Sequence, residues 1–143
     1  MEREVTILIV EDDDGHADLI QTNLERAGFK NTTLRFKDGQ EVIDFLFGAE
    51  TRNKCAYLML LDINMPRIDG IEVLRRVKES DVYKSIPVIM LTTTDDPREV
   101  QHCHELGCSN YVAKPVDYEA FIYAVRQLGL FLKIVEIPVR KGS

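Results

Sequence analysis

Short, largely apolar runs alternate with stretches whose apolar residues follow helical spacing, and this alternation repeats five times along the chain. The runs predicted to be β-strands are residues 5–10, 32–36, 57–62, 87–92 and 110–113, of which the second is the weakest. Helices are expected after them, over residues 14–28, 39–48, 70–79, 95–107 and 117–133. Because parallel strands need long crossover connections, five such units predict one doubly wound α/β domain, a parallel sheet with helices on both faces.

The third apolar run, Tyr57 to Leu61, leads without interruption into a single carboxylate, Asp62. Asn64, Pro66 and Gly70 follow it and are residue types that favour turns. This pattern is typical of a buried central strand that ends abruptly in a loop. Ligand crevices of open α/β sheets lie at the carboxyl ends of the strands, so Asp62 is a candidate functional residue.

Polar and charged side chains follow four of the predicted strands, and parallel pairing would bring them to one edge of the sheet. They are Glu11, Asp12 and Asp13 after the first strand, Asp62 after the third, Thr92 at the end of the fourth, and Lys114 after the fifth. Crowded carboxylates repel one another unless a cation neutralises them, and all-oxygen ligands favour a hard ion such as Mg²⁺. Asp13 and its neighbour Asp14 are better explained as a helix cap and a solvated charge than as metal ligands.

The residue types at this edge suit phosphoryl transfer to a carboxylate. With Mg²⁺ holding phosphoryl oxygens, Asp62 could act as the nucleophile and form an acyl phosphate. Lys114 would supply a mobile positive charge, and the Thr92 hydroxyl could donate to a phosphoryl oxygen.

Composition narrows the class of protein. The chain has 143 residues, 45% of them hydrophobic, which is enough for one domain with a proper core. The net charge of −6 disfavours direct binding to nucleic acid. The apolar run near the start is too short for a signal or membrane-spanning segment, so we expect a soluble cytoplasmic protein without a membrane partner.

Four motifs together resemble the receiver domain of two-component response regulators. They are Ile9-Val10-Glu11-Asp12, Leu61-Asp62-Ile63-Asn64-Met65-Pro66 with Asp69-Gly70, Leu91-Thr92, and Tyr111-Val112-Ala113-Lys114-Pro115. The resemblance implies a flavodoxin-like fold with strand order 2-1-3-4-5 and five helices. It also implies a regulator in a phosphorelay rather than an enzyme.

The resemblance assigns roles to the matching positions. Asp62 would be phosphorylated by a sensor histidine kinase, with Lys114 and Thr92 assisting. Mg²⁺ would be held by Asp12, Asp62 and the backbone carbonyl of Asn64, with Glu11 as an outer acidic partner. Thr92 and Tyr111 would form the switch that repacks the face made by the fourth helix, fifth strand and fifth helix.

The C-terminal part predicts a subtype. Residues 1–133 are expected to form the receiver domain and residues 134–143 a tail, with no output domain, so that the signal would leave through a downstream protein partner. The last helix is unusually apolar, and Ile122 and Tyr123 are predicted to belong to a surplus strip that forms an interface. This region resembles the small response regulators paired with cyanobacterial and bacterial phytochromes, which implies a phytochrome as kinase and a homodimer through the last helix and tail.

Two alternatives remain open. A pseudo-receiver would bind partners without phosphorylation, but intact Asp12, Asp62, Thr92 and Lys114 count against it. A phosphatase or phosphotransferase would need a general acid near Asp62, and Asn64 occupies the place where an aspartate could serve.

Overall fold

The computed structural model of the protein describes residues 5–48, 56–93, 96–114 and 117–127. Within them, strands and helices alternate as the sequence predicts. The elements are β1 (Val5–Val10), α1 (Asp14–Arg26), β2 (Thr33–Phe36), α2 (Gly39–Phe47), β3 (Ala56–Asp62), α3 (Gly70–Glu79), β4 (Val88–Thr92), α4 (Pro97–Leu106) and β5 (Asn110–Ala113). A fifth helix, called the C-terminal helix below, is described over residues 118–127.

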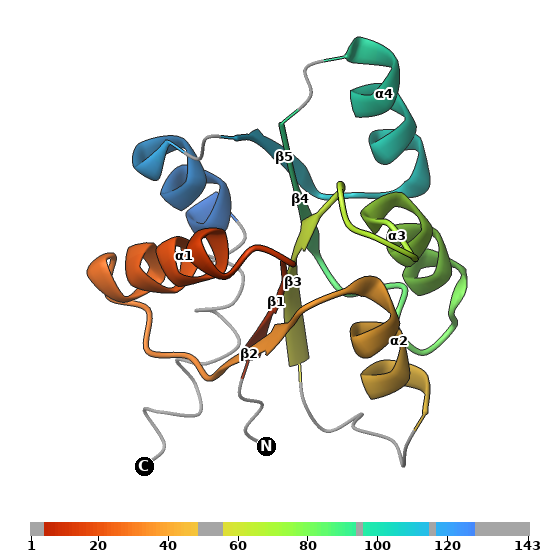
Figure 1. Cartoon of the computed structure of the whole chain (residues 1–143), viewed down its shortest axis with the longest axis horizontal. Helices are drawn as coiled ribbons and strands as arrows, with labels where there is room; N and C mark the ends of the chain where they lie inside the picture. Colours follow the sequence, from red (N-terminus) through yellow and green to blue (C-terminus); the bar gives the residue numbers. More distant parts are fainter. Residues whose placement is uncertain (1–4, 49–55, 94–95, 115–116, 128–143) are drawn as a thin grey trace.

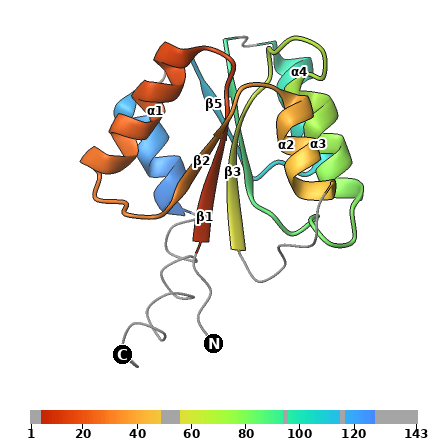
Figure 2. The same cartoon turned by 60° about the horizontal axis from the view of Figure 1, so that its bottom comes forward.

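The five strands form one sheet in the order β2-β1-β3-β4-β5, and every neighbouring pair is parallel. The predicted fold class and strand order are therefore confirmed. Figure 1 shows α1 and the C-terminal helix on one face of the sheet and α2, α3 and α4 on the other. The turned view in Figure 2 shows the same two layers of helices with the sheet between them.

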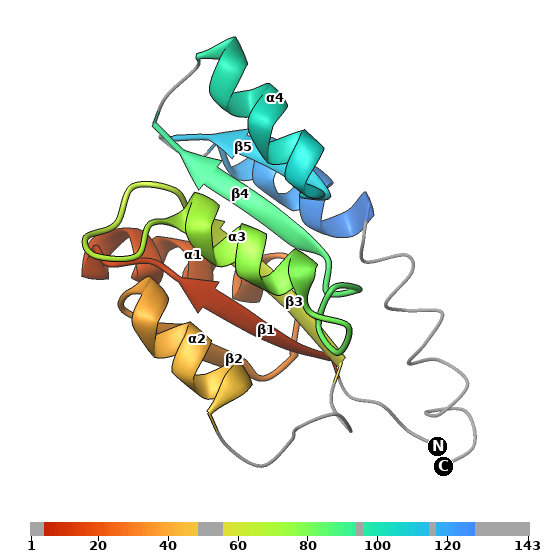
Figure 3. The ribbon, with the colours of Figure 1, turned by 90° about the vertical axis from the view of Figure 1, so that its right-hand side faces the viewer.

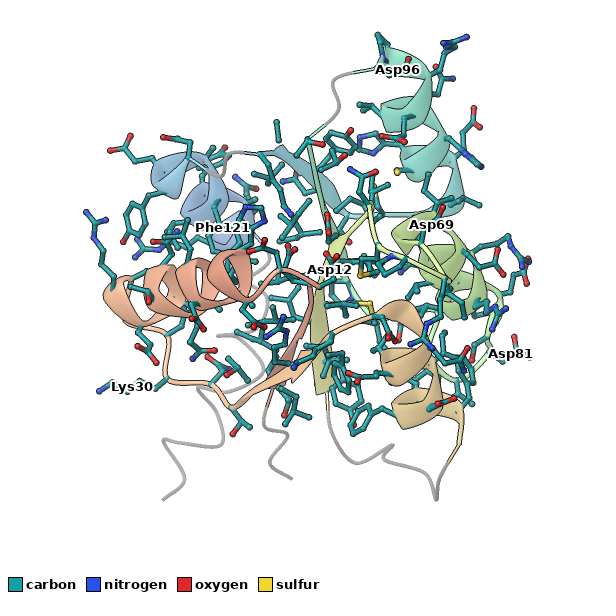
Figure 4. All side chains as sticks on the ribbon, viewed as in Figure 1. Asp12, Lys30, Asp69, Asp81, Asp96 and Phe121 are labelled. Carbon is teal, nitrogen blue, oxygen red and sulfur yellow. The ribbon has the colours of Figure 1, made fainter. Side chains whose placement is uncertain are left out.

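Two apolar clusters fill the spaces between the sheet and its helices. β3 contributes to both, because successive side chains of a strand point to opposite faces: Met59 and Leu61 belong to the cluster under α2, α3 and α4. Leu58 and Leu60 belong to the cluster under α1 and the C-terminal helix, together with Phe121, which is labelled in Figure 4. A strand buried on both faces explains why its sequence is continuously apolar rather than alternating.

Aspartates begin the helices at the loops that follow the strands. Asp13, Asp38, Asp69 and Asp96 each accept a hydrogen bond at the side chain from a backbone N–H in the first turn of α1, α2, α3 and α4. Such caps satisfy N–H groups that have no partner inside the helix. Asp13 is therefore a cap, as predicted.

The strand register brings the ends of the strands to one edge. Val10 pairs with Leu61, Asp62 with Leu91, and Thr92 with Ala113. The residues at and just after these pairs are the predicted site residues. Figure 3 shows β1 and β4, with their arrowheads, pointing toward the same end of the sheet.

The loop from β3 to α3 packs directly on the backbone at the end of β3. The Gly70 N–H donates to the carbonyl of Ile63 at 2.9 Å. A Cβ at Gly70 would lie 2.8 Å from the Ile63 Cα atom, and closer still to the carbonyl oxygen of Asp62. Only glycine allows this approach, so Gly70 fixes the path of the chain just after Asp62.

One prediction for the last helix is wrong. Ile122 lies in the core with an exposed fraction of 7%, beside the fully buried Phe121, rather than on an outer strip. The arc of a helix that faces a sheet is wide enough to include two successive positions, which explains the error. Tyr123 is 65% exposed, as predicted. The rest of the predicted strip and the tail, residues 128–143, lie outside the described residues.

Candidate functional site

Three carboxylates meet at the carboxyl edge of the sheet. Glu11 and Asp12 directly follow β1, and Asp62 is the last residue of β3. One oxygen of each lies within 4.8 Å of the others. Glu11 and Asp62 are buried, whereas Asp12, which is labelled in Figure 4, is exposed.

Lys114 lies against the two buried acids. Its Nζ atom donates to Glu11 Oε1 at 2.8 Å and to Asp62 Oδ1 at 3.2 Å. Its backbone N–H donates to the carbonyl of Thr92 at 2.6 Å, which holds residue 114 at the end of β4. Glu11 after β1, Asp62 at the end of β3 and Lys114 after β5 thus meet at one edge of the sheet, as the sequence predicts. Their ion pairs were not predicted.

The surroundings of Asp62 disfavour its charged form. Burial and, after it, the charge of Glu11 raise the pKa of Asp62, the ammonium of Lys114 opposes both effects, and the net pKa is about 6. Burial by itself would lower the pKa of Lys114, but its hydrogen bond to Glu11 and the attraction of both acids raise that pKa above its ordinary value. Glu11, Asp62 and Lys114 therefore form a buried cluster of two acidic groups and one basic group.

An excess of acidic groups of this kind fits a divalent cation. All three acids offer oxygen atoms, and hard ions such as Mg²⁺ prefer oxygen ligands. The open side of the cluster is formed by the exposed Asp12. The donor set thus suits Mg²⁺ better than a softer ion, which would favour sulfur or imidazole.

The remaining predicted residues lie on β4, on β5 and in the loop after β3. Thr92 ends β4 and is completely buried. Tyr111 of β5 packs against the apolar cluster under α2, α3 and α4. The Asn64 N–H lies 3.4 Å from Asp62 Oδ1, and the Asn64 side-chain amide donates to Thr93 Oγ at 3.2 Å. Asn64 is exposed and so lies at the rim of the site.

Two residues at the site were not predicted. Arg35 of β2 donates from Nε and Nη2 to the carbonyl oxygen of Glu11, at 2.9 and 2.7 Å, and pairs with Asp14 at 3.0 Å. His16, in the first turn of α1, places Nδ1 at 3.3 Å from Lys114 Nζ. A charged residue inside the short apolar strand was a signal for Arg35, whereas nothing in the sequence pattern marks His16.

A family model, a protein of related sequence and solved structures all indicate the same family for this chain. Residues 7–126 match the response regulator receiver domain family. The probable methanogenesis regulatory protein FilR2 of Methanothrix harundinacea is 32% identical over 123 residues, which cover 85% of this chain and 79% of that protein.

Solved structures agree with this result. A response regulator receiver domain from Rhodospirillum rubrum superposes with a TM-score of 0.76 at 46% identity, covering 92% of this chain and 95% of that one. The bacteriophytochrome response regulator AtBRR gives a TM-score of 0.73 at 35% identity, covering 90% and 94%. With the family match over most of its length, and with this fold and site, the chain belongs to the response regulator receiver domain family of two-component signalling.

Proposed function

We propose that the protein is a response regulator that accepts a phosphoryl group on Asp62 from a sensor histidine kinase. The observation that carries the proposal is the environment of Asp62, a buried carboxylate at a strand end between Glu11 and Lys114. A buried carboxylate at a strand end, beside an ammonium group, suits the formation of an acyl phosphate. In the transfer, an Asp62 oxygen bonds to phosphorus as the bond from phosphorus to the donor nitrogen breaks, and that nitrogen keeps the electron pair.

The proposal includes Mg²⁺ held by Asp12, Asp62 and the backbone carbonyl of Asn64, with Glu11 as an outer acidic partner. The ion would neutralise charge on the phosphoryl oxygens. Lys114 lies 3.2 Å from Asp62 Oδ1 and would exchange this contact for a phosphoryl oxygen. Thr92 and Lys114 would then share the charge that the phosphoryl group brings into the site.

The proposed switch runs from Thr92 to Tyr111. Thr92 ends β4, and its neighbour in the sheet is Ala113, two residues after Tyr111. A Thr92 hydroxyl drawn toward a phosphoryl oxygen would change the packing around β5, which the half-buried Tyr111 could follow. This change would reach the face formed by α4, β5 and the C-terminal helix.

The proposed partners follow from the family and its neighbours. The kinase would be a phytochrome or a related sensor kinase, since the similar structures include a bacteriophytochrome response regulator. A homodimer through the C-terminal helix and the following residues is also proposed, and the 65% exposed Tyr123 supports it. We propose a cytoplasmic protein without direct binding to nucleic acid or membrane. The described residues include no helix long and apolar enough to cross a membrane.

Phosphorylation by a small donor tests the proposal. The purified protein is incubated with acetyl phosphate and Mg²⁺, and its intact mass is compared with that of the Asp62→Asn variant. We expect one phosphoryl group on the wild type, none on the variant, and none when a chelator is present. An unchanged mass of the wild type, with metal bound, would contradict the proposal and favour the pseudo-receiver.

A further inference from the structure

His16 lies in the first turn of α1, where its side chain contacts Lys114. Its backbone is fixed, because the His16 N–H donates to Asp13 Oδ1 at 2.9 Å as part of the helix cap. Its side chain is 51% exposed. A substitution at this position therefore changes the imidazole while the cap of α1 remains.

The imidazole contacts the ammonium of Lys114. Nδ1 of His16 is 3.3 Å from Lys114 Nζ and 3.7 Å from Glu11 Oε2. An ammonium group has hydrogens to donate and no lone pair, so in this contact Nδ1 accepts. A hydrogen bond between these two atoms requires the tautomer with its ring proton on Nε2, which is an uncharged imidazole.

This contact completes the set of acceptors around Lys114. Lys114 Nζ lies within hydrogen-bond distance of three side-chain atoms, Glu11 Oε1, Asp62 Oδ1 and His16 Nδ1. Two of these atoms belong to carboxylates, and the third belongs to an imidazole. If Glu11 were its only partner, the Lys114 ammonium could move around that contact, because the lysine side chain is flexible and its ammonium group can donate in many directions.

We propose that His16 is a positioning residue for Lys114. The imidazole holds the ammonium over Asp62 when the hydrogen bond between Lys114 and Asp62 gives way to a phosphoryl oxygen. A neutral acceptor suits this task, because it fixes the position of the ammonium without neutralising the charge that the phosphoryl group needs. The inference rests on the proposed function and adds a residue to it.

The test compares four proteins in phosphorylation by acetyl phosphate at saturating Mg²⁺, with the rate followed by intact mass. His16→Leu removes the acceptor and keeps the bulk, whereas His16→Asn keeps an oxygen near the position of Nδ1. His102→Leu is the matched control, because His102 is exposed on α4, outside the site.

We expect His16→Leu to lower the maximal rate roughly three- to tenfold, the loss of one hydrogen bond to a charged group at a half-exposed position. The donor concentration for half-maximal rate should stay within about twofold, since donor binding is not the step affected. His16→Asn and His102→Leu should react within about twofold of the wild type. Equal rates for His16→Leu and wild type would overturn the inference, and so would an asparagine variant as slow as the leucine variant.

A second comparison covers the case in which the leucine variant unfolds. Glutamine carries its oxygen near the position of Nε2 rather than Nδ1. We therefore expect His16→Gln to be phosphorylated more slowly than His16→Asn. Equal rates for these two variants would overturn the inference. In the wild type, the ¹⁵N signal of His16 Nδ1 should move when Lys114 is replaced by methionine, and an unmoved signal would also overturn it. A wild type that accepts no phosphoryl group would instead refute the proposed function, while the ¹⁵N comparison would still report on the contact.

Discussion

Replacing Asp62 by asparagine should stabilise the protein in the absence of metal at neutral pH. The pKa of Asp62 is raised from 3.8 to about 6, mainly by burial and then by the charge of Glu11. A difference of about two between the pKa values of the folded and unfolded states corresponds to about 3 kcal/mol of unfolding free energy. Asparagine has the same shape without the charge, so the variant avoids most of this cost.

The sign of the pH dependence follows from the direction of the pKa change. The folded state binds the Asp62 proton more tightly than the unfolded state, so raising the pH from about 4 to about 6 removes a proton that favours folding. The destabilisation is small near pH 4, grows through this window and is complete above pH 6. The gain from Asp62→Asn should therefore be about 2–3 kcal/mol near pH 7.5 and under about 1 kcal/mol near pH 4.

Urea unfolding in the presence of EDTA measures this difference at the two pH values. Asp81→Asn is the matched control, because the Asp81 side chain is 96% exposed, and it should change stability by no more than about 0.5 kcal/mol. With the proposed metal site, added Mg²⁺ should stabilise the wild type and narrow the gap, since a ligand that binds only the folded state raises its stability. An Asp62→Asn variant that is no more stable than wild type near pH 7.5, or a gain that is equal at both pH values, would refute the reasoning.

Two further substitutions test the supports of the site. Gly70→Ala would place a Cβ against the carbonyl oxygen of Asp62, so we expect a loss of about 3 kcal/mol or more in urea unfolding, and a loss below about 1 kcal/mol would show that the loop yields easily. Arg35→Met removes both hydrogen bonds to the carbonyl of Glu11 and should cost about 1–3 kcal/mol and weaken Mn²⁺ binding measured by titration. Asp14→Asn, which removes only the exposed ion pair of Arg35, should cost at most about 1 kcal/mol, and equal effects of the two variants would refute the role of the carbonyl contact.

The sequence predicts those features that depend on local chemistry or on strand order. An unbroken apolar run places Asp62 at the end of a buried strand, and the aspartate before α1 marks a helix start because its side chain caps an N–H group three residues away. Given parallel pairing, the ends of β1, β3, β4 and β5 must then meet at one edge.

Features that depend on distances between elements escape prediction. The contact of His16 with Lys114 joins residues 98 positions apart, and it depends on the exact placement of α1 over the sheet. The inward position of Ile122 depends on how closely the C-terminal helix packs, which a helical repeat does not specify. Arg35 is partly predictable. A charged residue within an apolar edge strand indicates a special role, but its partner is a backbone carbonyl, which no sequence pattern identifies.

Chemical trapping of the acceptor tests the central claim most directly. The protein is phosphorylated by a phosphohistidine donor in Mg²⁺, reduced with borohydride, digested and sequenced by mass spectrometry. Borohydride converts an acyl phosphate on an aspartate into homoserine, so we predict homoserine at position 62 alone, and none when the donor or Mg²⁺ is omitted. Homoserine at Asp12 or at another acidic residue, or its absence from a protein that has gained a phosphoryl group, would contradict the assignment of Asp62.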